Sequence, residues 1–223
     1  FSCSMRKAKE LFKSSYHFIL AGLMVSIYGS TDKFMLKQLL NEAEVGYYST
    51  AVSLCNTWVF LLTAIIDSLY PVILQSFNNK ELFERKNKQL YSIVFYISVS
   101  VSILFSVLAT PVVRILYGKA YIAAAAPLRI ITWYTAFSYL GVARNAWIVS
   151  YNKQNYLKYL YIGAAITNVV LNVIMIPLWG ASGAAFASLL TQISTILVFP
   201  ALIKDLRPNV KLMVDAILLK KVF

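Results

Sequence analysis

Charged side chains inside long apolar segments are the residues of this chain most able to do chemistry. Asp32, Asp67, Arg129 and Arg144 each lie in such a segment. A charge among apolar residues is costly unless it faces water, a partner or a membrane interface, so each of the four is a candidate for a role in binding. The alternative for the two arginines is that they extend to the membrane interface, where water solvates them.

An aromatic and cationic stripe runs through the segment that contains both arginines. Its members recur at helical spacing: Trp133, Phe137, Leu140, Arg144, Trp147 and Tyr151. Aromatic rings suit the apolar faces of a sugar, and a guanidinium group binds phosphate through parallel hydrogen bonds. The stripe therefore predicts a site for a sugar that is attached to phosphate.

The acidic and amide side chains have two interpretations each. Asp32 and Lys33 are neighbours and cannot pair on one helix face, so we expect Asp32 to face a cavity, with a buried salt bridge as the alternative. Asp67 has either a functional role or a place at an interface. Asn168 and Asn172 lie one turn apart and are expected to hold helices together rather than to touch a substrate. We predict a substrate cavity formed by Arg144, Asp32, Trp147, Trp133, Arg129 and Asp67.

Signatures of enzymes are nearly absent. Glu42 and Glu44 follow Asn41 in the pattern of a capping box, which is the structural alternative to a catalytic carboxylate pair. The single histidine, His17, lies at the edge of an apolar segment, and no nucleotide-binding, zinc-protease or serine-hydrolase motif occurs. The two cysteines have no metal-binding spacing. We therefore predict no enzyme, no metal site and no cofactor, and a membrane glycosyltransferase that uses Glu42 or Glu44 is the alternative.

Six apolar stretches must position these residues, and each is about long enough to cross a bilayer as a helix. The chain is 59% hydrophobic and only 13% charged, which also indicates a membrane protein. We predict an all-α, polytopic bundle of about six transmembrane helices. The stretches are Tyr16–Leu36, Val45–Leu74, Leu90–Ala109, Ala124–Tyr151, Tyr156–Leu178 and Ala181–Ile203.

The net charge of +12 is distributed unevenly between the connecting segments. Most lysines and arginines outside the apolar stretches fall on one side if the chain crosses the membrane six times. This is the positive-inside pattern, which predicts that both ends are cytoplasmic and argues against nucleic acid as a partner. We expect a basic cytoplasmic linker at 1–15, the transmembrane bundle at 16–203 and a basic, amphipathic cytoplasmic tail at 204–223. Because it begins at Phe1, the chain is expected to be a piece of a longer protein.

Several short motifs, in order and spacing, carry a resemblance to a known family. They are Asp32-Lys33-Phe34-Met35-Leu36, Glu44-Val45-Gly46-Tyr47-Tyr48-Ser49-Thr50-Ala51, Leu116-Tyr117-Gly118-Lys119-Ala120-Tyr121, Leu128-Arg129-Ile130, Lys153-Gln154-Asn155-Tyr156, Asn168, Leu171-Asn172, Ile176-Pro177 and Gly180-Ala181-Ser182-Gly183-Ala184-Ala185. Together they resemble the C-terminal half of a Wzx-like polysaccharide or oligosaccharide flippase, of the multidrug/oligosaccharidyl-lipid/polysaccharide exporter superfamily.

The resemblance implies two six-helix bundles around a cavity that opens alternately to each side of a bacterial inner membrane. It implies an undecaprenyl-diphosphate-linked sugar repeat unit as substrate, membrane lipids as surroundings and an upstream six-helix half as partner. It leaves open whether H⁺ or Na⁺ drives transport. This chain departs from the pattern in holding one bundle only. A multidrug or cation exporter of the same superfamily is the second interpretation, which the scarcity of acidic residues deep in the segments disfavours.

Overall fold

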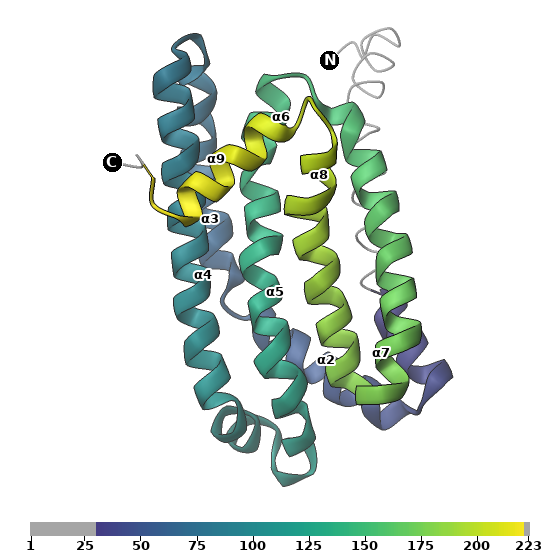
Figure 1. The fold of residues 1–223 in the computed structure, drawn as a ribbon. Coiled ribbons are helices and arrows are strands. Elements are labelled where there is room, and N and C mark those ends of the chain that lie inside the picture. The colour runs from purple at the N-terminus through teal and green to yellow at the C-terminus, as the bar shows by residue number, and fades with distance from the viewer. Residues whose placement is uncertain (1–29, 221–223) are drawn as a thin grey trace, which may run out of the picture.

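The computed structural model describes residues 30–220, and within them the chain is helical, with no strand (Figure 1). The predicted linker at 1–15 and the first part of the first apolar stretch lie outside the described residues. The all-α fold is confirmed. After a helical segment at 30–39, the principal helices are α2 Glu42–Asn56, α3 Val59–Gln75, α4 Lys80–Tyr117, α5 Ala125–Ala143, α6 Asn145–Ser150, α7 Leu157–Ile193, α8 Phe199–Leu202 and α9 Arg207–Ile217.

Three helical stretches are long and apolar enough to cross a membrane: Val59–Asn78, Lys80–Tyr117 and Gln154–Leu202. The third is not one straight helix. Gly180 interrupts α7 with φ 56° and ψ −134°, so that the chain passes down through 157–179 and returns through 181–193 toward α8 (Figure 1). The two predicted segments at 156–178 and 181–203 are thus the two arms of one hairpin, and the protein is a multi-pass membrane protein.

The turn at Gly180 requires glycine for two reasons. Its positive φ is a conformation that residues with a side chain rarely adopt. A Cβ atom at this position would also lie 2.5 Å from the Glu44 carboxylate, which accepts a hydrogen bond of 2.6 Å from the backbone N–H of Ala181. The capping box predicted at the start of α2 is therefore only half formed: Asn41 accepts from the N–H of Glu44 at 3.1 Å, but the Glu44 side chain caps the second arm of α7 instead.

The helix α5 lies in the middle of the bundle and contacts α4, α7 and α2 (Figure 1). Two clusters of buried apolar side chains surround it, one toward α9 and one toward the start of α2. Large apolar side chains on the outside of the bundle are exposed, for example Phe60 at 71%, Val107 at 70% and Ile115 at 80%. An apolar outer surface is what a bundle that faces lipid needs.

The C-terminal segment packs against the bundle instead of standing apart from it. The apolar face of α9 is buried through Leu212, Met213 and Ala216. Two side chains of α4 hold its last turn: the Ser92 hydroxyl donates to the Ala216 carbonyl at 2.9 Å, and the Tyr96 hydroxyl donates to the Ile217 carbonyl at 2.8 Å. The amphipathic pattern of this segment is thus used for packing on α4, while its predicted cytoplasmic location stays a prediction.

Candidate functional site

A buried carboxylate with four hydrogen-bond donors forms the most polar point inside the bundle. The Tyr48 and Ser188 hydroxyls each donate to Asp32 Oδ2 at 2.5 Å. The amide groups of Asn168 and Asn172 donate to Asp32 Oδ1 at 3.0 and 2.6 Å. We call these five residues the Asp32 cluster.

The cluster joins four helical segments. Asp32 lies in the helix at 30–39, Tyr48 in α2, the two asparagines in the first arm of α7 and Ser188 in its second arm. Asn168 and Asn172 are one turn apart, so both amides reach the same carboxylate. Sequence reasoning expected these asparagines to hold helices together, and they do so by binding Asp32. This is a more specific contact than an amide pair between helices.

The charge of Asp32 has no positive partner within residues 30–220. Its side chain is only 1% exposed, and its four donors are neutral groups. A buried charge without a counter-charge is expensive. The cluster also holds one spare oxygen acceptor, because the buried Oδ1 of Asn172 has no hydrogen-bond partner within the described residues. Such an arrangement of oxygens around one carboxylate can take up a proton or a small hard cation.

No group of three or more histidine, cysteine, aspartate or glutamate side chains comes together within the described residues. The part of the chain that the structure describes therefore has no group of such side chains that could bind a zinc or iron ion.

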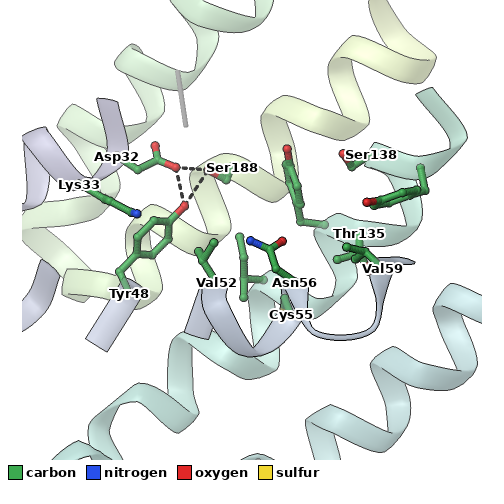
Figure 2. A pocket seen from close by; sticks show the side chains of 13 residues that line it. Asp32, Lys33, Tyr48, Val52, Cys55, Asn56, Val59, Thr135, Ser138 and Ser188 are labelled. Carbon is green, nitrogen blue, oxygen red and sulfur yellow. Dashed lines mark hydrogen bonds between the residues drawn. The ribbon is translucent and has the colours of Figure 1, made fainter. Parts of the chain in front are cut away.

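A cavity of about 250 Å³ opens beside the cluster, and we call it the Asp32 cavity. Figure 2 shows Asp32, Tyr48 and Ser188 at one end and Thr135 and Ser138 at the other. The lining mixes charged, hydroxyl and apolar side chains: Asp32, Lys33, Tyr48, Val52, Cys55, Asn56, Val59, Ile131, Tyr134, Thr135, Ser138, Tyr139 and Ser188.

The Asp32 cavity holds groups that suit a polar, phosphorylated ligand. Lys33 is exposed and lines the cavity next to Asp32, which places an ammonium group there. Tyr134 and Tyr139 add aromatic surface with hydroxyl groups. Sequence reasoning did not place Lys33, Tyr48 or Ser188 in the substrate cavity, although Lys33 and Tyr48 belong to motifs behind the family resemblance.

The other predicted site residues do not line the Asp32 cavity. Arg144 is 1% exposed, between α5 and α6, and its Nε and Nη1 have no hydrogen-bond partner within residues 30–220. Trp147, at 3% exposed, lies in the apolar cluster near α9 and stacks on Tyr151 with ring centroids 4.6 Å apart. The stripe is therefore a real face of these helices, but it points into the protein. A contact of Arg144 or Trp147 with substrate stays a prediction.

Arg129 and Trp133 bind α4 instead. The Arg129 side chain donates to the Ser106 carbonyl at 3.3 Å and to the Thr110 hydroxyl at 3.0 Å, and the Trp133 indole donates to the Ser106 hydroxyl at 3.1 Å. Asp67 lies exposed on α3. Of the six predicted residues, Asp32 lies at the Asp32 cavity. Substrate contacts of Arg129, Trp133 and Asp67 stay predictions.

Comparison with known proteins gives two matches. Residues 1–126, which are more than half of the chain, match the model of a family described as polysaccharide biosynthesis protein. The chain is also similar to the lipid II flippase MurJ of Bacillus subtilis (strain 168), with 27% identity over 203 residues, which cover 84% of this chain and 37% of the relative. The chain thus spans little more than a third of the length of that curated relative. No solved structure matches this chain.

Proposed function

We propose, because this chain belongs to the polysaccharide biosynthesis protein family, that it is one helical bundle of a flippase that moves a lipid-linked oligosaccharide across the membrane. The proposed substrate is an undecaprenyl-diphosphate-linked sugar repeat unit, and transport proceeds by alternating access. The similar protein from Bacillus subtilis is named a flippase for lipid II, which supports transport rather than catalysis as the activity.

The Asp32 cavity is the observation that carries this proposal. A lipid-linked sugar diphosphate needs a cation for its phosphates and hydroxyl and aromatic groups for its sugars. Lys33 provides the cation, while Tyr134, Tyr139 and the hydroxyls of Thr135 and Ser138 provide the rest. These groups gather inside a bundle whose outside is apolar, which is the arrangement that a polar headgroup needs in order to cross a membrane.

Contacts of the two acidic residues in the first turn of α2 support a transporter over a glycosyltransferase. Glu44 caps the second arm of α7 through the Ala181 N–H, and Glu42 forms an ion pair of 2.8 Å with Lys37. Each carboxylate thus has a structural partner of its own. A catalytic pair would need both carboxylates directed at one reacting bond.

The transport step is proposed to need a second bundle. The Asp32 cavity, at about 250 Å³, is smaller than the roughly 300–1,000 Å³ of pockets for drug-sized ligands. An oligosaccharide headgroup is larger still, so the remaining space must come from another set of helices. In transporters built from two bundles, the substrate binds between them and the bundles rock against each other. The proposed partner is an upstream six-helix half, and the proposed location is a bacterial inner membrane with both ends of this segment cytoplasmic.

Asp32 is the proposed site of coupling to H⁺ or Na⁺. Uptake of a proton or a cation would compensate a buried charge that has neutral donors only. The same event changes the bonds that Asp32 makes to both arms of α7, so it can bias the arrangement of the bundle.

The test is export of surface polysaccharide by the full-length protein in a strain that lacks its own flippase. We expect Asp32→Asn to abolish export at wild-type levels of inserted protein, and Lys33→Ala to reduce it strongly. Glu81→Gln is the matched control, since Glu81 is an exposed acidic residue of α4 that does not line the Asp32 cavity, and it should export normally. Normal export by both Asp32→Asn and Lys33→Ala would contradict the proposal.

An exporter of cationic drugs is the second candidate, and the burial of Asp32 favours it. A carboxylate that is 1% exposed and lines a cavity can neutralise a cationic ligand. The same variants distinguish the two candidates. Loss of resistance to cationic drugs by Asp32→Asn, with polysaccharide export unchanged, would select the exporter.

A further inference from the structure

A second cavity lies at the end of the bundle where α9 crosses α4. Its volume of about 550 Å³ is more than twice the 250 Å³ of the Asp32 cavity. Its wall comes from the first turns of α4, from α6 and the loop that follows, and from α9. We call it the basic-end cavity, because four of its lining side chains are lysines: Lys80, Lys88, Lys153 and Lys211.

Carboxylates neutralise two of these lysines. Lys88 Nζ lies 3.5 Å from the Asp215 carboxylate, and this pair ties α4 to α9. Lys153 Nζ lies 2.6 Å from the Asp205 carboxylate, which fixes the loop after α6 to the segment before α9. Both pairs shape the wall of the cavity. Glu84 is the third carboxylate of the lining, so four lysines face three carboxylates and the formal charge of the lining is positive by one.

The other two lysines of the lining are available to a ligand. Lys211 is exposed and has no ion pair within residues 30–220. Lys80 has a side chain that is 83% exposed and reaches Glu84 at only 4.0 Å, which is a weak contact. They stand on different helices, α9 and α4, and line the same cavity. Two such ammonium groups can together bind one phosphate.

A buried positive charge nearby adds to the potential of this cavity. Arg144 lies one helical turn before Trp147, which lines the cavity, and no carboxylate bonds to the guanidinium group within the described residues. Tyr91 of α4, which interacts electrostatically with Arg144, accepts a hydrogen bond of 2.8 Å from Asn209 of α9. Arg144 thus lies near Tyr91, the residue through which α4 contacts α9, and it does not itself line the cavity. An uncompensated charge in low dielectric attracts an anion into neighbouring space.

We propose that the basic-end cavity binds the phosphate headgroup of an anionic phospholipid from the membrane leaflet at that end of the bundle. Basic pockets between membrane helices bind such headgroups. The apolar lining fits the glycerol and the start of the acyl chains, since Pro208, Leu212 and Trp147 contribute to it beside the lysines. This site differs from the Asp32 cavity, and its occupancy does not depend on the transport proposed above.

The test measures binding of phosphatidylglycerol to the purified chain in detergent micelles by native mass spectrometry, with phosphatidylcholine as the neutral comparison. One lysine beside an anionic headgroup contributes about fivefold in affinity. The double variant Lys80→Ala with Lys211→Ala should therefore bind phosphatidylglycerol about 25-fold more weakly. The matched control is Lys204→Ala with Lys220→Ala, which removes two exposed lysines at the same end that do not line the cavity. The control should bind like wild type, and binding of phosphatidylcholine should not change.

A second measurement does not rely on variants. A photoactivatable phosphatidylglycerol should crosslink to peptides that contain the start of α4 and α9. Equal losses of phosphatidylglycerol affinity in the two double variants would show that the lipid is attracted to a charged surface rather than to the cavity, and would overturn the proposal. Binding of glycerol 3-phosphate as tight as that of phosphatidylglycerol would assign the site to a soluble phosphate and would also overturn it. Crosslinks that avoid both helices would do the same.

Discussion

Replacement of Asp32 by asparagine and by alanine separates the charge of the Asp32 cluster from its hydrogen bonds. Asp32 Oδ1 accepts from the amides of Asn168 and Asn172, and Oδ2 accepts from the hydroxyls of Tyr48 and Ser188. An asparagine can keep Oδ1 toward the two amides and turn Nδ2 toward the two hydroxyls, because a hydroxyl accepts as well as donates. We therefore expect Asp32→Asn to fold with a stability close to that of wild type.

Alanine removes the acceptor for both amides. A buried donor without a partner costs about 1–3 kcal/mol, which gives about 2–6 kcal/mol for two. The amide of Asn172 keeps a bond of 3.1 Å to Asn168, and the hydroxyls of Tyr48 and Ser188 lie 3.5 Å apart and can bind each other. The cost should therefore fall in the lower half of the range, about 2–4 kcal/mol. For a chain of this size that corresponds to a melting temperature lower by about 4–16 °C.

The assay is thermal unfolding in detergent micelles, followed with a dye that fluoresces when it reacts with a thiol. Cys55 is only 2% exposed, so it reports unfolding of the bundle. Cys3 lies outside the described residues and is replaced by serine in every variant. Asp67→Ala, on an exposed site of α3, controls for the loss of an acidic residue. The reasoning fails if Asp32→Ala melts with wild type, or if Asp32→Asn falls as far as Asp32→Ala.

Three further predictions concern topology, the α7 turn and pH. Single cysteines at Asn79 and Ala120 in a Cys-free background should differ in intact cells: an impermeant thiol reagent should label Ala120→Cys only, and the reverse would invert the proposed orientation. Gly180→Ala should lower the melting temperature, because φ 56° with ψ −134° costs other residues about 1–3 kcal/mol, while Gly46→Ala, whose Cβ meets its nearest atom at 3.9 Å, should have little effect. Hydrogen bonds from its lysine and tyrosine partners hold the pKa of Asp205 below its usual value. The stabilising contribution of the Asp205 carboxylate is therefore fully present above about pH 3.9 and is lost as the pH falls through the lowered pKa. Any difference in melting temperature between wild type and Asp205→Asn should thus be constant from pH 5 to 8 and vanish in stronger acid.

The helical membrane fold could be predicted from the sequence because it depends on local composition. Long apolar runs leave the backbone no way to satisfy its polar groups in lipid except within a helix. The ends of helices were less predictable where a partner far along the chain decides them. Glu44 has the sequence context of a capping box, yet its carboxylate binds Ala181, which is 137 positions away. Nothing in the residues next to Glu44 indicates that contact.

The candidate site was predicted only in part, for a related reason. Asp32 was predicted because placing a charged carboxylate in an apolar segment costs free energy, and helical spacing placed Asn168 and Asn172 on one face. The assembly of these residues with Tyr48 and Ser188 depends on how four helical segments pack, which no spacing within one segment encodes. The stripe that contains Arg144 shows the opposite case. The predicted periodicity is correct, because these side chains do share one helix face. Periodicity does not tell which part of the protein that face contacts, and in the structure the face is buried toward α4 and α9.

The position of Asp32 also explains how one chemical event could reach the whole bundle. Its carboxylate is bonded to the first arm of α7 through two asparagines and to the second arm through Ser188. Glu44 binds the Ala181 N–H at the turn between those arms, and it lies in the first turn of α2, the helix that carries Tyr48. A proton or cation at Asp32 competes for the same lone pairs as these donors, so it must loosen contacts to α2 and to both arms of α7 together. In the proposed transport cycle, that shared loosening couples ion occupancy to the arrangement of the helices around the Asp32 cavity.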